Sequence, residues 1–284
     1  MVAEDIVVMT GIPGWNRFDE IARDYDNNFL LTRRPAQRLV EFAAVKPRMR
    51  VLEVGCGTGF ATFQIARDLL PGGLLLATDL SAEMVKVAQA NANRKSVSNV
   101  QFKVMDGAQL NLTDNEFDLL ICCHALFGFP DIGKALKEWK RVLKPGGVLA
   151  FSSISIRRKH LVERKEVAEV FSRYFEKELN QRMKDRPLST PEDIAVRLDT
   201  IGLETIDIRE ENLAYRYQTF NEFWNAMTSS PFKLRLNLLE EEQILLLRND
   251  LEDLLGEEFA QEGYLETNPT ILTKARKPEG SGMT

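Results

Sequence analysis

The chain has 284 residues, of which 44% are hydrophobic and 28% charged, a composition typical of a globular protein. Its formal net charge of -5 argues against a broad nucleic-acid-binding surface, which needs a basic excess. The chain shows no apolar run of membrane-spanning length and no signal peptide. The cysteines Cys56, Cys122 and Cys123 have no disulfide or metal-site spacing. We therefore expect a cytoplasmic protein with reduced thiols, without a bound metal or membrane insertion.

Short apolar segments alternate with helical patterns through the first half of the chain. The apolar segments are typical of strands buried on both faces, and the helical ones carry capping signals such as Ser81 followed by Glu83. This alternation predicts a doubly wound, Rossmann-like α/β fold, with a mostly parallel sheet and helices on both faces. The expected strands are 50–55, 73–80, 100–106, 117–123 and 147–154.

The pattern changes after residue 154. A long helical pattern with a basic excess covers 157–186, and a helix starting at Pro191 and ended by Gly202 then leads into another strand. Two more helical patterns follow, and 268–277 has the composition of a closing edge strand. We interpret the chain as a single domain over 1–284, with an N-terminal segment (1–35) that covers the site and two helical insertions (155–187 and 212–266) that form a substrate lid.

The segment VLEVGCGTGF places Gly55, Gly57 and Gly59 directly after the first expected strand. Glycines this close together mark a backbone that approaches a ligand. The dinucleotide fingerprint G-x-G-x-x-G would need a glycine at Phe60. Glu53 is a poor neighbour for a pyrophosphate at a helix N-terminus, but it suits a positively charged ligand. Because S-adenosylmethionine carries an ammonium and a sulfonium and no phosphate, we favour it over a dinucleotide.

Two further acids follow the ends of expected strands. Asp79 ends the second strand, where a carboxylate can accept hydrogen bonds from ribose hydroxyls of either ligand class. Asp106 and Gly107 follow the third strand, where a side-chain acceptor and a backbone donor could contact the edge of an adenine. The carboxyl ends of parallel strands meet at one edge of the sheet, so we expect Glu53, Asp79 and Asp106 to share one crevice.

Five segments together resemble the successive motifs of class I S-adenosylmethionine-dependent methyltransferases. They are VLEVGCGTGF, TDLSAEMV, MDGAQLNLTDNEFD, CCHALFGFPD and LKPGGVLAFSSI, and the ubiquinone/menaquinone and small-molecule branch looks most similar. The resemblance covers residues 15–155 well and the rest loosely, and it specifies the cofactor better than the acceptor. It implies that the methionine end lies against Glu53, Gly55 and Gly57, the ribose against Asp79 and Leu80, and the adenine against Met84, Asp106 and Gly107, with Cys122 and Tyr25 also at the cofactor.

The chain departs from this branch in ways that bear on the acceptor. Phe127 and Gly128 stand where relatives often have paired histidines, and the signatures of nucleobase, glutamine and arginine methyltransferases are missing. The missing signatures favour a small-molecule acceptor with an O-, N- or C-nucleophile, and the missing histidine pair leaves no catalytic role to carry over from it. His124 and Tyr25 are the candidate catalytic residues, although each could be purely structural. An S-adenosylmethionine-binding enzyme with a non-methylating reaction, and a binding module without catalysis, remain alternatives.

Overall fold

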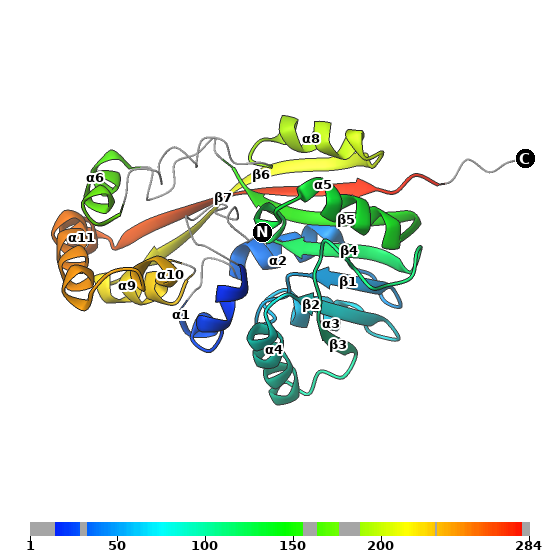
Figure 1. The fold of residues 1–284 in the computed structure, drawn as a ribbon, viewed down its shortest axis with the longest axis horizontal. Coiled ribbons are helices and arrows are strands. Elements are labelled where there is room, and N and C mark those ends of the chain that lie inside the picture. Colours follow the sequence, from blue (N-terminus) through cyan, green and yellow to red (C-terminus); the bar gives the residue numbers. More distant parts are fainter. Residues whose placement is uncertain (1–14, 29–32, 156–163, 176–187, 231, 280–284) are drawn as a thin grey trace, which may run out of the picture.

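The computed structural model describes residues 15–28, 33–155, 164–175, 188–230 and 232–279 (Figure 1). Its strands are β1 (Arg50–Val54), β2 (Leu74–Asp79), β3 (Val100–Val104), β4 (Phe117–Cys123), β5 (Leu143–Ile154), β6 (Glu204–Tyr217) and β7 (Tyr264–Arg276). They form a seven-stranded sheet in the order β3-β2-β1-β4-β5-β7-β6. The pairs among β1 to β5 are parallel, and β7 is antiparallel to both of its neighbours.

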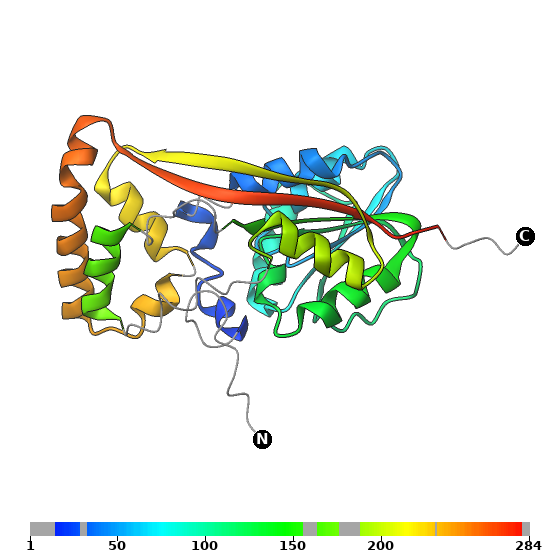
Figure 2. The same cartoon turned by 90° about the horizontal axis from the view of Figure 1, so that it is seen from above.

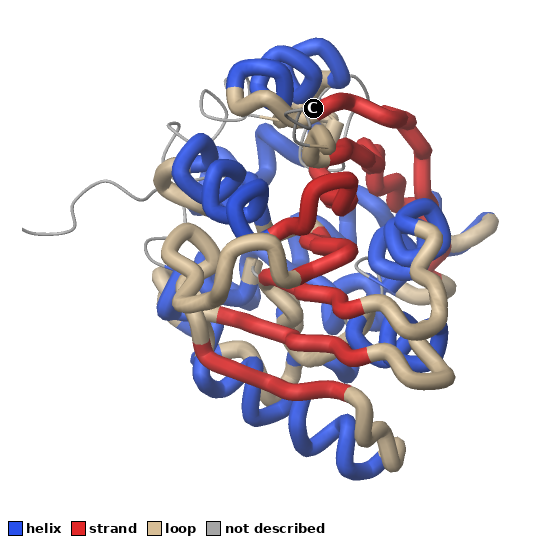
Figure 3. The backbone as a smooth tube through the Cα atoms, turned by 90° about the vertical axis from the view of Figure 1, so that its right-hand side faces the viewer, coloured by secondary structure: helices blue, strands red, loops and turns tan. Residues whose placement is uncertain are grey.

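Helices cover both faces of this sheet, which Figure 3 shows as a central layer of strands between helices. One face packs on α5 (Ile132–Val142) and α8 (Pro191–Thr200), the other on α2 (Arg33–Ala43) and α3 (Thr62–Asp68). The helix α4 (Ala82–Arg94) contacts β2 and β3. These arrangements confirm the predicted doubly wound, mostly parallel α/β fold.

Side-chain caps begin the helices α4 and α8, the first of them at the expected Ser81. Ser81 accepts a hydrogen bond from the Met84 N–H at the start of α4, and Thr190 accepts one from the Asp193 N–H at the start of α8. Each satisfies a backbone donor that would otherwise lack a partner in the first turn. The first residues of α4 and α8 are therefore determined by hydrogen bonds within the first turn of each helix.

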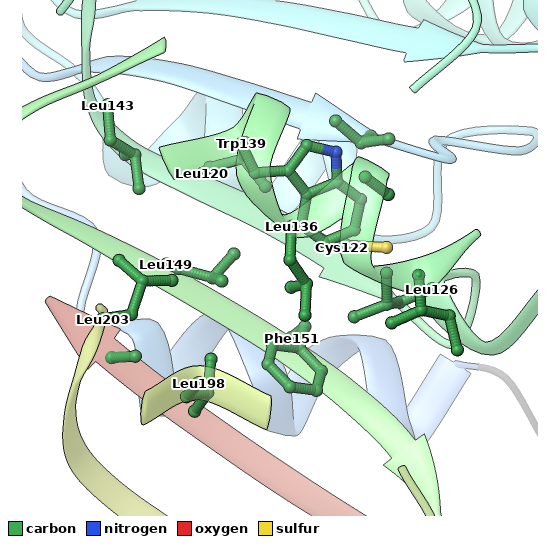
Figure 4. Close-up of a cluster of buried hydrophobic side chains, with 14 of the residues drawn as sticks. Leu120, Cys122, Leu126, Leu136, Trp139, Leu143, Leu149, Phe151, Leu198 and Leu203 are labelled. Atoms are coloured by element: carbon green, nitrogen blue, oxygen red, sulfur yellow. The ribbon is translucent and has the colours of Figure 1, made fainter. Parts of the chain in front are cut away.

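A core between β4, β5, α5 and α8 supports the carboxyl-terminal edge of the sheet (Figure 4). Trp139 of α5 and Phe151 of β5 are both fully buried in it. The Trp139 indole N–H also donates a hydrogen bond of 2.8 Å to the Gly107 carbonyl. The core thus fixes the position of the loop that follows β3.

The prediction that 268–277 closes the sheet as an edge strand is wrong. β7 lies between β5 and β6, and β6 is the edge strand. The physical reason is burial on both faces: Ile271 and Leu272 are each fully buried, one in each of the two cores. β6 is largely exposed and charged, as an edge strand that must resist pairing with other chains usually is.

Beyond the sheet, β6 and β7 continue as a two-stranded ribbon that carries helices at its far end (Figure 2). In the sequence, three helices stand between β6 and β7: α9 (Phe220–Thr228), α10 (Lys233–Leu236) and α11 (Glu241–Gln261). They pack together with α6 (Lys165–Tyr174) around a separate apolar core. We call α6, α9, α10 and α11 the cap. The helical part of the second predicted insertion is shorter than 212–266, because 212–217 and 264–266 belong to the ribbon. Most of the first insertion, including 157–159, lies outside the described residues.

Candidate active site

The glycine loop after β1 leaves open space at only one of its three glycines. Gly55, Gly57 and Gly59 have φ of +74°, +53° and +106°, a region that other residues rarely adopt. A Cβ on Gly55 would lie 2.6 Å from the Ala125 Cβ, and one on Gly59 would lie 2.7 Å from the Phe63 ring. A Cβ on Gly57 would meet no atom within 4 Å. The outer two glycines are therefore required by the protein's own packing, whereas the space at Gly57 can admit a ligand.

Glu53 is a buried carboxylate without a cationic partner among the described residues. It is 1% exposed and accepts a hydrogen bond of 2.6 Å from the Thr62 hydroxyl. Burial raises its pKa from 4.5 to about 8; the Asp79 charge acts in the same direction and the Thr62 hydrogen bond opposes it. An acid held neutral in this way becomes ionised most readily when a cation is placed beside it. This is the electrostatic setting expected for an ammonium-bearing ligand.

Asp79 connects the glycine loop to the end of β2. One carboxylate oxygen accepts the Gly57 N–H at 2.8 Å, and the other accepts the Ser81 N–H at 2.9 Å. Burial raises the pKa of Asp79 in spite of these bonds, which act to lower it. Because each carboxylate oxygen has two lone pairs, both can still accept a ligand hydroxyl.

Asp106 and Gly107 lie beside Asp79, since the Met105 N–H donates to the Asp79 carbonyl at 2.9 Å. The Asp106 side chain is exposed, and one of its oxygens accepts the Ala108 N–H at 2.8 Å. Gly107 is buried, and a Cβ there would lie 2.5 Å from a Val54 methyl. Leu80 is 52% exposed. The structure therefore brings the predicted ribose- and adenine-binding residues to one edge of the sheet.

Met84 lies beneath the N-terminal segment. It is 2% exposed and clusters with the fully buried Ile21, Ala22 and Leu234, of which Leu234 belongs to the cap helix α10. Tyr25 borders the same cluster, with its ring centroid 6.2 Å from that of Phe60. The predicted contacts of Met84 and Tyr25 with a cofactor remain predictions.

Two acids of the N-terminal segment bind the cofactor side of the fold and were missed by sequence reasoning. One Asp19 oxygen accepts hydrogen bonds from the Ser81 hydroxyl and the Glu83 N–H. Asp26 accepts one of 2.6 Å from the Asn91 amide, which also donates to the Thr58 carbonyl at 3.0 Å. No motif marks these acids, since their partners lie more than sixty residues away.

Unsatisfied buried polar atoms stand next to the glycine loop. The Thr58 hydroxyl and the second Asp26 carboxylate oxygen have no hydrogen-bond partner in the part of the chain that the structure describes. A buried polar group without a partner is costly, so native structures rarely leave one unless a ligand or water completes it. These atoms fit a polar ligand between the loop and the N-terminal segment.

His124 directly follows β4 and has an unusual backbone conformation. Its φ is +48°, its N–H donates to the Ser152 hydroxyl at 3.0 Å, and its side chain is half-buried. Strained residues of this kind gather at functional sites, although the strain alone assigns no role. Cys122, in contrast, is fully buried in the core of Figure 4, so only its backbone is available at the strand end.

In the described ranges, no three His, Cys, Asp or Glu side chains are grouped so that they could hold a metal ion. None of the helices in these ranges combines the length and the apolar character that crossing a bilayer requires.

Comparison with known proteins gives one family match and several similar proteins. A family model described as a methyltransferase domain matches residues 45–215. Demethylmenaquinone methyltransferase from Staphylococcus carnosus is 35% identical over 136 residues, which cover 46% of this chain and 56% of that relative. The chain therefore spans little more than half of that relative's length.

Two solved structures share the fold at low sequence identity. Phosphoethanolamine N-methyltransferase 2 from Haemonchus contortus, in complex with S-adenosyl-L-methionine, has a TM-score of 0.59 at 20% identity, over 94% of this chain and 61% of that one. The [4+2]-cyclase SpnF has a TM-score of 0.57 at 21% identity, over 87% of this chain and 82% of that one. At these identities the likeness shows the fold alone.

Replacing Asp79 tests its predicted contact with ribose. Asp79→Ala should weaken the binding of S-adenosylhomocysteine by about 10–100-fold, because each charge-assisted hydrogen bond is worth roughly 1.5–3 kcal/mol. Isothermal titration calorimetry measures the affinity. Asp79→Asn, which keeps one acceptor oxygen, should lose less, and wild-type affinity in a folded Asp79→Ala variant would contradict the assignment.

The raised pKa of Glu53 predicts a pH dependence of both stability and binding. Between about pH 5 and 8, folded Glu53 keeps a proton that the unfolded chain has lost, so the free energy of unfolding should fall as pH rises. Glu53→Gln should flatten this fall in part, since Asp79 and Glu266 contribute in the same direction. Thermal unfolding at a series of pH values measures it.

The same substitution separates the two ends of the ligand. At pH 7, binding of S-adenosylhomocysteine to the wild type should release up to about one proton as its ammonium ionises Glu53, a release detected by calorimetry in buffers of different ionisation enthalpy. Glu53→Gln should lose the release and bind S-adenosylhomocysteine more weakly, while its affinity for adenosine barely changes. Equal losses for both ligands would show that Glu53 does not face the amino-acid end.

Proposed function

Because the chain belongs to the methyltransferase-domain family, whose model matches residues 45–215, we propose that it transfers a methyl group from S-adenosylmethionine to a small-molecule acceptor. The observation that carries this proposal is the glycine loop, open at Gly57 and flanked by the buried acids Glu53 and Asp79. An uncompensated carboxylate beside an open backbone suits a cationic ligand and opposes a pyrophosphate.

Each end of the cofactor has a matching group in the chain. Glu53 would hold the ammonium, Asp79 the ribose hydroxyls, and Asp106 with the Gly107 N–H the adenine edge. When bound, the cofactor supplies a methyl group on a positively charged sulfur that is a good leaving group. Most of the catalytic effect can then come from positioning the acceptor in line and excluding water.

The chain's own residues can do this positioning from two sides. His124 is held at the end of β4 by its backbone bond to Ser152, and it is the candidate base for an acceptor that must lose a proton. On the other side, the N-terminal segment and α10 meet at Leu234 and cover Met84. We infer that these two elements, with the rest of the cap, form the lid over the acceptor, and that Tyr25 orients either the acceptor or the methyl group.

A second function, a non-methylating reaction on a small molecule, is favoured by one observation. The [4+2]-cyclase SpnF has the same fold, so the fold accommodates chemistry other than methyl transfer. The two functions differ in the fate of the cofactor, since only methyl transfer consumes it.

The proposal also covers the kind of partner and the cellular compartment. The net charge of -5 favours a small-molecule partner over nucleic acid. All three cysteines are free thiols, two of them buried, which is consistent with a reducing compartment such as the cytoplasm.

Methyl transfer is tested with S-adenosylmethionine carrying a deuterated methyl group and a mixture of cellular small molecules. We expect S-adenosylhomocysteine to form and one acceptor to gain the labelled methyl group, both detected by mass spectrometry. Tyr25→Phe should lower this turnover while cofactor affinity barely moves if the hydroxyl orients the reacting groups. Conversion of an acceptor without formation of S-adenosylhomocysteine would instead support the non-methylating function.

The lid role of the N-terminal segment predicts a change in hydrogen exchange. Ordering a backbone costs roughly 1–2 kcal/mol per residue, and the few apolar contacts of this segment offset that cost better when a ligand lies beneath it. Amides of residues 15–28 should therefore exchange more slowly after S-adenosylhomocysteine is added, as mass spectrometry can measure. Equal protection with and without the ligand would mean that the segment is ordinary structure.

A further inference from the structure

One face of the β6–β7 ribbon is covered at both ends and less completely between them. Near the sheet, Arg38 of α2 forms two hydrogen bonds with Glu211 at 2.7 and 2.8 Å. At the far end, Tyr217 and Tyr264 are buried in the cap core. Between these two ends, on the same face, the register places Tyr215 opposite Glu266. Glu266 therefore lies on the ribbon between the sheet and the cap.

Glu211 and Glu266 lie on the same face of the ribbon but in opposite electrostatic settings. The Arg38 guanidinium lowers the pKa of Glu211. No cation of the described residues pairs with Glu266, and burial raises its pKa to about 7. Even so, Glu266 keeps an intermediate exposed area, so the residue is not sealed from solvent.

The hydroxyl of Tyr217 lies beside Glu266 and is itself an unsatisfied polar group. Tyr217 is 1% exposed, and its hydroxyl faces the Glu266 carboxylate. It nevertheless completes no hydrogen bond of standard geometry with any group that the structure describes. A buried hydroxyl and a partly buried carboxylate that face each other without standard hydrogen-bond geometry both gain from a ligand donor placed between them.

The surrounding rings complete a cation-binding environment. The Tyr215 and Tyr217 ring centroids are 4.8 Å apart, and Phe223 lies 5.6 Å from Tyr217 and 5.5 Å from Tyr264. Aromatic faces attract ammonium groups, and desolvation strengthens that attraction. Arg164, the residue before α6, is already engaged by both oxygens of Glu258, at 2.8 and 3.2 Å.

We propose that Glu266, with the Tyr217 hydroxyl and the ring of Tyr215, forms a distal acceptor subsite that binds a protonated amine. The inference rests on the proposed function and specifies its substrate class, an acceptor with a basic group remote from the methylated atom. Thr270 pairs with Ile154, the last residue of β5, and Glu266 is four residues further along β7. At ~3.3 Å per residue, the subsite lies about 13 Å beyond the edge of the sheet, so the acceptor must be elongated.

A matched pair of probes tests the subsite directly. The protonated amine 2-phenylethylammonium and the neutral 2-phenylethanol differ in charge while sharing the same ring and chain length. In the presence of S-adenosylhomocysteine, the wild type should bind the amine at least about tenfold more tightly, because one charge-assisted hydrogen bond is worth that factor or more. Titration calorimetry measures both affinities. Glu266→Gln should abolish the preference.

Glu257→Gln is the matched control, since it removes the same charge from an exposed position of α11 in the same cap. It should keep the wild-type preference for the amine. A wild type that does not prefer the amine, or a preference that survives Glu266→Gln, would overturn the proposal. Affinity for S-adenosylhomocysteine, measured in the same samples, separates this failure from that of the proposed function. If that ligand does not bind, the amine titration without it still reports on the subsite.

Discussion

The hydrogen bond from the Gly57 N–H to the Asp79 carboxylate is the contact on which the site depends. Three residues with positive φ make the glycine loop conformationally costly, and within the loop one backbone hydrogen bond, from the Gly59 N–H to the Cys56 carbonyl at 3.0 Å, spans its tip. Asp79 fixes that tip to the end of β2 through a hydrogen bond of 2.8 Å. Its carboxylate also accepts a hydrogen bond from the N–H of Ser81, the residue that caps α4. One carboxylate thus joins the loop after β1 to the end of β2 and to the start of α4. The same burial leaves Asp79 and Glu53 with raised pKa values, which a cationic partner would lower.

The N-terminal segment connects this edge of the sheet to the cap. Its ion pair with the cap, Lys233 to Asp24 at 3.0 Å, is largely exposed and contributes little on general grounds. The buried cluster of Ile21, Met84 and Leu234 matters more, because apolar burial does not suffer screening by solvent. A ligand bound under the segment and an acceptor bound under the cap would therefore both change the packing of the same few side chains.

Much of the fold could be predicted because its signals are local. Strands buried on both faces are continuous apolar runs, as in β4, and the residues that begin α4 and α8 satisfy backbone donors within their own first turn. The position of the last strand was predicted wrongly because an apolar run followed by cations is compatible with both an edge and an inner position in a sheet. The predicted bounds of the second helical insertion, 212–266, were too wide for a similar reason. Residues 212–217 look irregular on their own and become a strand only by pairing with 264–269.

The sequence by itself determined the doubly wound fold, the glycine loop and the placement of Glu53, Asp79 and Asp106 at strand ends. It could do so because the carboxyl ends of parallel strands meet at one edge whatever the rest of the chain does. Only the tertiary structure decided which distant groups meet: Asp26 with Asn91, Leu234 with Met84, and the uncompensated Glu266 with Tyr217. Such contacts join segments separated by tens of residues or more, and neither partner carries a local pattern that depends on the other. Their positions are fixed by packing, which the order of residues expresses only once the whole chain has folded.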